Sequence, residues 1–183
     1  MLKRRDDPFM LVIGMTSVKM GDRLAQVGCA HGPRLAAIAA KVGLSGRAVA
    51  LVPDEESAAR ARKGAEQAGV LVEVEIAPPT SLPIEAASFD LVILDNTGGL
   101  LTEMSEEDRG ASVREAKRIT RPGGRVMVLG TSPPTGLAAL LSRGQSSPRY
   151  DSTPLLVKAG FKSVRTLAER DGLVFVEAIK SRT

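Results

Sequence analysis

Two residue types that build metal and redox sites are almost missing from this sequence. It has one cysteine, Cys29, and one histidine, His31. A single cysteine excludes an internal disulfide, and one residue of each type is too few for a Cys-based or His-rich metal centre. We therefore expect no bound metal and a reducing, cytoplasmic setting.

Aromatic residues and long apolar runs are also scarce. Phe, Trp and Tyr make up 3% of the chain, and tryptophan is absent. Proteins that bind single-stranded nucleic acid stack bases on aromatic rings, so this composition argues against that function. The apolar run 9–15 is much shorter than the roughly 20 residues of a membrane span. It predicts a short helix at 8–17, within an N-terminal segment 1–20 that packs on the domain.

The excess of positive charge is small. The formal net charge is +4, and the densest basic run, 3–5, is followed at once by Asp6 and Asp7. We interpret this as a solvated surface and expect no nucleic-acid partner. The hypothesis of a nucleic-acid-modifying enzyme would have only the basic isoelectric point to support it.

The 183 residues suit one domain, 1–183, in which strands alternate with helices. This alternation predicts an α/β fold with a mostly parallel sheet and helices on both faces. Asp171 and Gly172 predict the turn of a closing antiparallel hairpin. A Ser/Pro/Gly-rich segment, 131–151, is expected to be a mobile loop with one short helix at 137–142. The other expected helices are 33–42, 55–68, 106–120 and 153–159; the expected strands are 24–28, 47–52, 70–76, 89–94, 125–130, 161–168 and 173–179.

A glycine-spaced turn follows the first expected strand. Gly28 and Gly32 flank Ala30, and Pro33 then opens a helix at a position that tolerates proline. Glycine lets the backbone approach a ligand closely, and the N–H groups at a helix start hold anions such as carboxylates. A strand, a glycine-rich turn and a helix in this order are typical of a nucleotide-type site.

Four stretches in order resemble the class I S-adenosylmethionine-dependent methyltransferases, especially the ubiquinone and menaquinone C-methyltransferases that act on small molecules. They are 21–32, 88–93, 114–125 and 156–161. The resemblance implies a Rossmann-like, doubly wound, seven-stranded sheet with a C-terminal antiparallel hairpin. It implies displacement of the methyl group from the sulfonium of S-adenosylmethionine by an acceptor held at the carboxyl ends of the strands. The cofactor-binding residues that it implies are Gln26, Gly28, Cys29, Ala30, Gly32, Val52, Pro53, Thr80 and Asp95.

Three positions depart from the pattern of that family, so its cofactor motifs are degenerate here. Gln26 and Val52 stand where the family usually has acidic residues, and Pro78 stands where Asp is common near the adenine. Each lost polar contact costs about 1–3 kcal/mol, or one to two decades of affinity. Asp54 or Glu55 could instead reach the ribose from the next turn, or could only cap the following helix.

The candidate catalytic residues are Asp95, Asn96 and His31. Asp95 and Asn96 follow the fourth expected strand and could orient an acceptor, or could form a solvated turn. His31 could act as a base, although a bulky residue inside a glycine-spaced turn is more often structural. Tyr150 is a weaker candidate beside the acceptor site.

Two functions therefore stay open. The first is a methyltransferase that acts on a small-molecule acceptor, in agreement with the order of the motifs. The second is a non-catalytic, methyltransferase-like domain that serves as a binding or partner subunit in a homo- or hetero-oligomer. The substitutions at Gln26, Val52 and Pro78 favour this second function, because fold alone does not confer chemistry.

Overall fold

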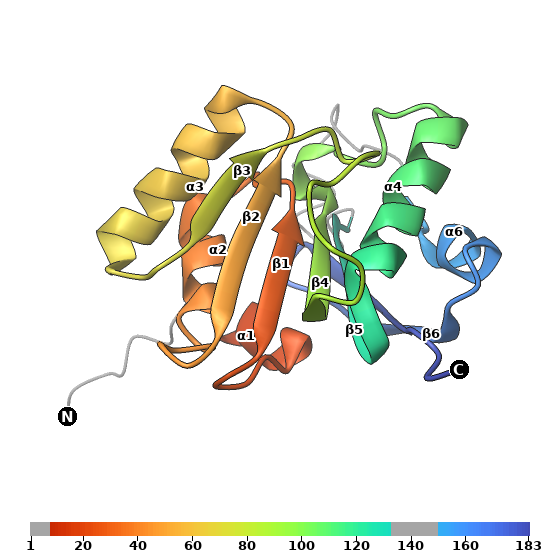
Figure 1. Ribbon diagram of the computed structural model, residues 1–183. Helices are drawn as coiled ribbons and strands as arrows, with labels where there is room; N and C mark the ends of the chain where they lie inside the picture. Colours follow the sequence, from red (N-terminus) through yellow and green to blue (C-terminus); the bar gives the residue numbers. More distant parts are fainter. Residues whose placement is uncertain (1–7, 133–149) are drawn as a thin grey trace.

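One seven-stranded sheet forms the centre of the computed structural model, which describes residues 8–132 and 150–183 (Figure 1). Its strands are β1 (Arg23–Val27), β2 (Arg47–Val52), β3 (Glu73–Ile76), β4 (Phe89–Asp95), β5 (Thr120–Thr131), β6 (Lys162–Arg170) and β7 (Leu173–Ile179). They lie in the order β3-β2-β1-β4-β5-β7-β6. Strands β1 to β5 pair in parallel, whereas β7 is antiparallel to β5 and β6. The predicted α/β, Rossmann-like sheet with a C-terminal hairpin is confirmed.

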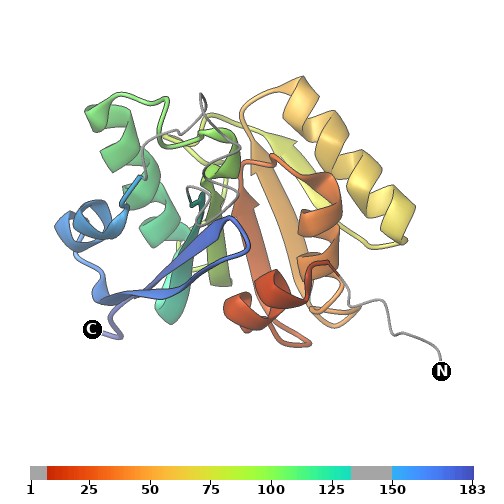
Figure 2. The same cartoon turned by 180° about the vertical axis from the view of Figure 1, so that it is seen from behind.

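Helices cover both faces of this sheet. The helices are α1 (Met10–Thr16), α2 (Gly32–Ala39), α3 (Glu55–Ala68), α4 (Glu106–Ile119) and α6 (Thr153–Lys158). Side chains of α1, α2 and α3 pack on one face, and α1 and α2 lie in front of the sheet in Figure 2. Side chains of α4 and α6 pack on the other face. Strand β2 serves both layers, because Leu51 packs with α4 and Val52 packs with α2 and α3.

Capping residues set the ends of the helices where the sequence predicts them. The Asp54 side chain accepts a hydrogen bond from Ser57 N (2.7 Å), and Ser105 caps α4 in the same way. Gly69 ends α3 with φ 64°. The hairpin turn has positive φ at both Asp171 (55°) and Gly172 (75°), the conformation that suits a two-residue connection between twisted strands.

Some boundaries differ from the prediction. Strand β3 begins at Glu73 rather than at residue 70, and α2 ends at Ala39 rather than at residue 42. The predicted turn 121–124 lies inside β5 as an irregularity, because the pairing shifts between Phe89 and Leu91 of β4. The predicted helix 137–142 and nearly all of the predicted loop 131–151 lie outside the described residues. Across the part of the chain that is described, no helix is long and apolar enough to cross a membrane.

Candidate functional site

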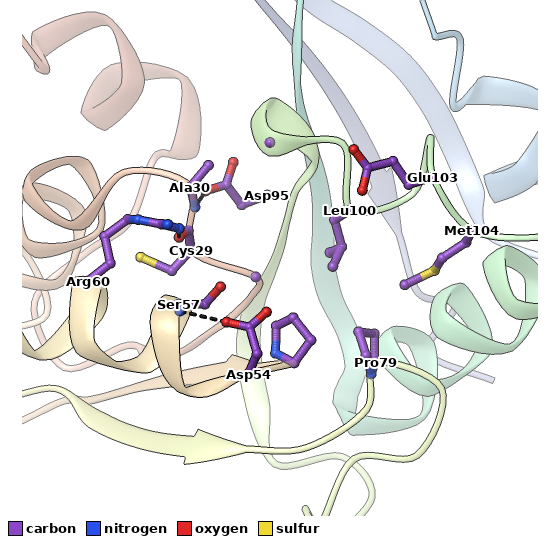
Figure 3. Close-up of a pocket in the computed structure, with 13 residues that line it drawn as sticks. Cys29, Ala30, Asp54, Ser57, Arg60, Pro79, Asp95, Leu100, Glu103 and Met104 are labelled. Atoms are coloured by element: carbon purple, nitrogen blue, oxygen red, sulfur yellow. Dashed lines mark hydrogen bonds between the residues drawn. The ribbon is translucent and has the colours of Figure 1, made fainter.

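A pocket of about 580 Å³ opens at the carboxyl ends of β1, β2 and β4 (Figure 3). The chain runs from β1 outward to β2 and β3, then returns to place β4 on the other side of β1. Ligands of open parallel sheets bind where the strand order reverses in this way. We call this the main pocket. Its lining residues are Gly28, Cys29, Ala30, Pro53, Asp54, Ser57, Arg60, Pro79, Asp95, Gly98, Leu100, Glu103 and Met104.

The turn after β1 places bare backbone against the main pocket. Gly28 has φ 81°, a conformation that side chains rarely adopt. A Cβ atom at this position would lie 3.1 Å from Leu100 Cδ2 and 3.2 Å from the Asp95 carbonyl oxygen. Position 28 therefore requires glycine for both its conformation and its surroundings. Cys29 and Ala30 follow it along the wall of the pocket, as the resemblance implies.

Asp95 ends β4 and joins the two sides of this site through its buried carboxylate. Its Oδ1 lies 3.0 Å from Arg34 Nη2, and its Oδ2 accepts hydrogen bonds from Arg34 Nη2 (3.2 Å) and Ala30 N (3.0 Å). Thr97 donates to Oδ1 from its backbone N–H (3.2 Å) and from its hydroxyl group (2.6 Å). Arg34 also donates a hydrogen bond to the Thr97 hydroxyl. The Asp95 carboxylate is thus paired with a cation, and both of its oxygens accept hydrogen bonds from the protein. This arrangement does not suit a free catalytic base.

Gln26 belongs to the same network rather than to the pocket wall. Its side-chain amide donates to the Gly28 carbonyl oxygen (3.0 Å) and to Asp95 Oδ2 (3.4 Å), and the residue is 1% exposed. Asp95 of β4 supplies the carboxylate of this network, and Gln26 of β1 supplies a neutral hydrogen-bond donor to it. Gln26 therefore supports the glycine-spaced loop after β1 through its side-chain amide.

The end of β2 presents Pro53 and Asp54 to the main pocket, whereas Val52 is 0% exposed and packs against α2 and α3. Asp54 caps α3 and also lines the pocket, and its reach to the ribose of a cofactor stays a prediction. The hydrogen bond from the Ser57 backbone holds the pKa of the Asp54 carboxyl below its usual range. An ionised, solvent-accessible acceptor therefore faces the pocket from the position after Pro53.

Gly32 serves helix packing in this structure. A Cβ atom on Gly32 would lie 2.2 Å from the Arg60 carbonyl oxygen, and one on Gly64 would lie 2.3 Å from the Gly32 carbonyl carbon. The two glycines therefore let α2 and α3 touch through their backbones.

Thr80 is half-buried and is not among the residues that line the main pocket, where Pro79 stands instead.

The other two candidate catalytic side chains have structural partners. The Asn96 side-chain oxygen accepts hydrogen bonds from Leu101 N (2.7 Å) and Thr102 N (3.2 Å), which closes the 3-10 turn η1 (Asn96–Gly98). His31 caps α2, since its Nδ1 accepts a hydrogen bond from Arg34 N (3.1 Å). Its ring also meets the edge of Phe9, with the ring centroids 5.6 Å apart. Neither side chain lines the main pocket, but Asn96 lines the smaller hollow described next.

A smaller hollow of about 370 Å³ lies beside the main pocket, and we call it the side hollow. Besides three glycines, its described lining has one carboxylate, from Glu103, and polar side chains from η1, the connection after it, the end of β5 and the stretch before α6: Asn96, Thr97, Thr102, Thr131 and Tyr150. The Tyr150 ring also carries the Arg109 guanidinium 5.5 Å from its centroid.

Comparison with known proteins now identifies the domain. A family model described as a methyltransferase domain matches residues 25–124. The chain belongs to this methyltransferase domain family. A 27-O-demethylrifamycin SV methyltransferase from Amycolatopsis mediterranei is 35% identical over 69% of the chain and 46% of its own length. The methyltransferase GfsG from Streptomyces halstedii is 29% identical over 78% of the chain and 54% of its own length. The methyltransferase domain thus spans about half the length of these two relatives.

Solved structures agree on the fold of the methyltransferase domain. A SAM-dependent methyltransferase from Aquifex aeolicus matches 95% of this chain and 94% of its own with a TM-score of 0.76 and 22% identity. The [4+2]-cyclase SpnF matches 96% of this chain and 80% of its own with a TM-score of 0.68 and 18% identity. The fold is that of S-adenosylmethionine-dependent methyltransferases, and a protein described as a cyclase shares it.

Several residues that line the main pocket of the methyltransferase domain escaped the sequence analysis. Arg60 reaches from α3, donating from Nη1 to the Cys29 carbonyl oxygen (2.7 Å) and pairing with Glu56 (2.6 Å). Leu100, Glu103 and Met104 come from the connection between η1 and α4. Their position shortly after β4 was the one sequence feature that could have indicated a place at the pocket. The connection between η1 and α4 has no recognisable motif of its own.

Proposed function

We propose that this methyltransferase domain binds S-adenosylmethionine in the main pocket and directs its methyl group to a small-molecule acceptor in the side hollow. The observation that carries the proposal is the main pocket itself, at the point where the strand order reverses and within the part of the chain that matches the family. Its volume of about 580 Å³ falls in the range of roughly 300–1,000 Å³ that is usual for small-molecule sites.

The lining suits the adenosyl part of this cofactor. Pro53, Pro79, Leu100 and Met104 offer apolar walls to an adenine ring, and Asp54 offers a carboxylate to the ribose hydroxyl groups. When bound, the cofactor supplies an electrophilic methyl group on a sulfonium. The protein then contributes binding and alignment, since displacement at that methyl group depends mainly on orientation.

The amino-acid end of the cofactor finds fewer free partners. Asp95 already takes the Ala30 N–H group, and Gln26 already donates to the Gly28 carbonyl oxygen. Val52 supplies no acceptor at the end of β2. These observations favour the second candidate function, a non-catalytic domain that binds a nucleoside-like ligand or a partner protein.

The side hollow favours a polar acceptor. Its described lining consists mainly of hydroxyl, amide and carboxylate side chains together with glycines. A hydroxyl-bearing compound matches these groups better than the apolar quinone that the resemblance to quinone C-methyltransferases suggests. The relative named for 27-O-demethylrifamycin SV, an O-demethylated compound, supports a hydroxyl acceptor here as well.

Calorimetric titration with S-adenosylmethionine and S-adenosylhomocysteine tests the proposal. We expect micromolar binding of both ligands by the wild-type protein. Asp54→Asn should weaken both by about tenfold, because it removes one charged hydrogen bond to the ribose while asparagine still caps α3. Asp22→Asn is the matched control, since Asp22 accepts a hydrogen bond from Lys19 N (2.9 Å) far from the pocket. If the folded protein gives no heat with millimolar ligand, cofactor binding is refuted and the non-catalytic function remains.

A further inference from the structure

Glu103 folds back over the turn that separates the two cavities. Its backbone N–H donates to the Gly99 carbonyl oxygen (2.9 Å), which closes the chain after η1. A Cβ atom on Gly99 would lie 2.8 Å from Glu103 Oε1, and Gly99 has φ 87°. The carboxylate therefore lies against a glycine, and Figure 3 shows it turned back toward η1.

The main pocket and the side hollow share two lining residues, Gly98 and Glu103. Gly98 contributes only backbone, and a Cβ atom there would lie 2.9 Å from Ala30 Cβ. If one cavity holds the methyl donor and the other holds the acceptor, the methyl group must cross at this junction. Among the described residues that line both cavities, Glu103 is the one with a charged side chain.

The other charged groups of the main pocket are engaged. Asp95 is paired with Arg34 and Arg60 is paired with Glu56, while Asp54 caps α3 and is assigned above to the ribose hydroxyl groups. Within residues 8–132 and 150–183, the Glu103 side chain has neither an ion pair nor a hydrogen bond. Its negative charge is therefore available to a ligand at the junction.

We propose that Glu103 faces the positive sulfonium and makes the site prefer S-adenosylmethionine over the neutral product S-adenosylhomocysteine. This inference rests on the function proposed above. The two ligands share the adenosine and the amino acid, so Asp54 acts on both alike. They differ in the methyl group and the positive charge on sulfur, so a carboxylate beside the sulfur attracts S-adenosylmethionine more strongly. Glu103 would thus retain the substrate cofactor and release the spent one.

The test is the ratio of the two dissociation constants, measured by calorimetry without any acceptor. We expect Glu103→Gln to reduce the preference for S-adenosylmethionine by about 3- to 10-fold and to leave the affinity for S-adenosylhomocysteine unchanged. Glu107→Gln makes the same charge change four residues along the chain, outside both cavities, and should leave the ratio as in the wild type. Because Glu103 is exposed, about 0.5 M salt should also shrink the wild-type preference.

The outcomes separate the two proposals. If the wild-type protein binds both ligands and Glu103→Gln leaves the ratio unchanged, or weakens both ligands equally, the role of Glu103 is overturned and cofactor binding stands. If the folded wild-type protein binds neither ligand, cofactor binding itself is overturned, and the role of Glu103 fails with it. Glu103→Asp keeps the charge and should retain most of the preference.

Discussion

Arg34 Nη2 lies 3.0 Å from Asp95 Oδ1, and the two side chains are only 10% and 0% exposed. Arg34 belongs to the first turn of α2, and Asp95 is the last residue of β4. The ion pair therefore ties the glycine-spaced loop to the centre of the sheet. Every polar contact that Asp95 makes nearby, including those from Ala30 N and Thr97, adds to this connection.

Removing one partner of this ion pair should destabilise the fold. Arg34→Met leaves the Asp95 carboxylate buried without its cation, and we expect the free energy of unfolding to fall by about 3–5 kcal/mol. Urea denaturation followed by circular dichroism measures this change. Adding Asp95→Asn to the same variant should recover part of the loss, since the unpaired charge is then gone.

The control for that variant is Arg62→Met. Arg62 pairs with Glu55 at the surface, where the two side chains are 51% and 71% exposed, and its loss should cost less than about 1 kcal/mol. Equal effects of Arg34→Met and Arg62→Met would show that the buried pair does not organise the site.

Restoring the acidic residue of the family in β1 should be harmful here. Gln26→Glu would bury a second carboxylate beside Asp95, whose Oδ2 now lies 3.4 Å from Gln26 Nε2. Like charges at this distance disfavour ionisation, so we expect a lower melting temperature at pH 8 than at pH 5 relative to the wild type. Gln67→Glu on the exposed face of α3 makes the same change without that neighbour. Improved stability and tighter cofactor binding in Gln26→Glu would contradict this interpretation of the network.

The backbone contact between α2 and α3 should not tolerate a methyl group. Gly64→Ala would place Cβ 2.3 Å from the Gly32 carbonyl carbon, and we expect a loss of about 1–3 kcal/mol despite the better helix propensity of alanine. Gly14→Ala in α1 is the matched control, because a Cβ atom there has no neighbour within 4 Å. That control should gain roughly 0.5–1 kcal/mol. Thermal melts of the two variants should therefore shift in opposite directions.

Cys29 should make stability depend on alkaline pH. Burial raises the pKa of its thiol to about 11, with a smaller contribution from the Asp95 carboxylate. An unfolded thiol ionises near pH 8.5, so the unfolded state loses its proton first and stability falls between about pH 8.5 and 11. At pH 10 the wild type should have lost about 1–2 kcal/mol more than Cys29→Ala, relative to pH 7. Unfolding curves that keep the same separation at both pH values would refute this assignment.

The sequence predicted the order of the elements because the local signals agree with one another. Asp54 and Ser105 are good caps, Gly69 ends a helix, and Asp171 with Gly172 makes a tight hairpin. Each signal acts over a few residues and needs no tertiary partner. Strand β3 and the irregular start of β5 were less predictable, because their extent depends on pairing with neighbouring strands.

The site was only partly predictable from the sequence. Gly28, Cys29, Ala30 and Pro53 line the main pocket as expected, because the turn after a strand places them there. The partners of Asp95 were not foreseen, since they come together only when β1, α2 and β4 assemble. The role of Glu103 at the junction has no sequence signature, since an exposed glutamate after a glycine pair is usually a solvated surface residue.

The contact between Gly32 and Gly64 gives the glycine spacing of the first loop a role in helix packing that does not depend on a cofactor. Selection for a stable pair of helices would preserve Gly32 in a descendant that had stopped binding any nucleoside. Gly28 is likewise fixed by its φ of 81°, so both glycines would persist in a lineage in which this domain had become a scaffold.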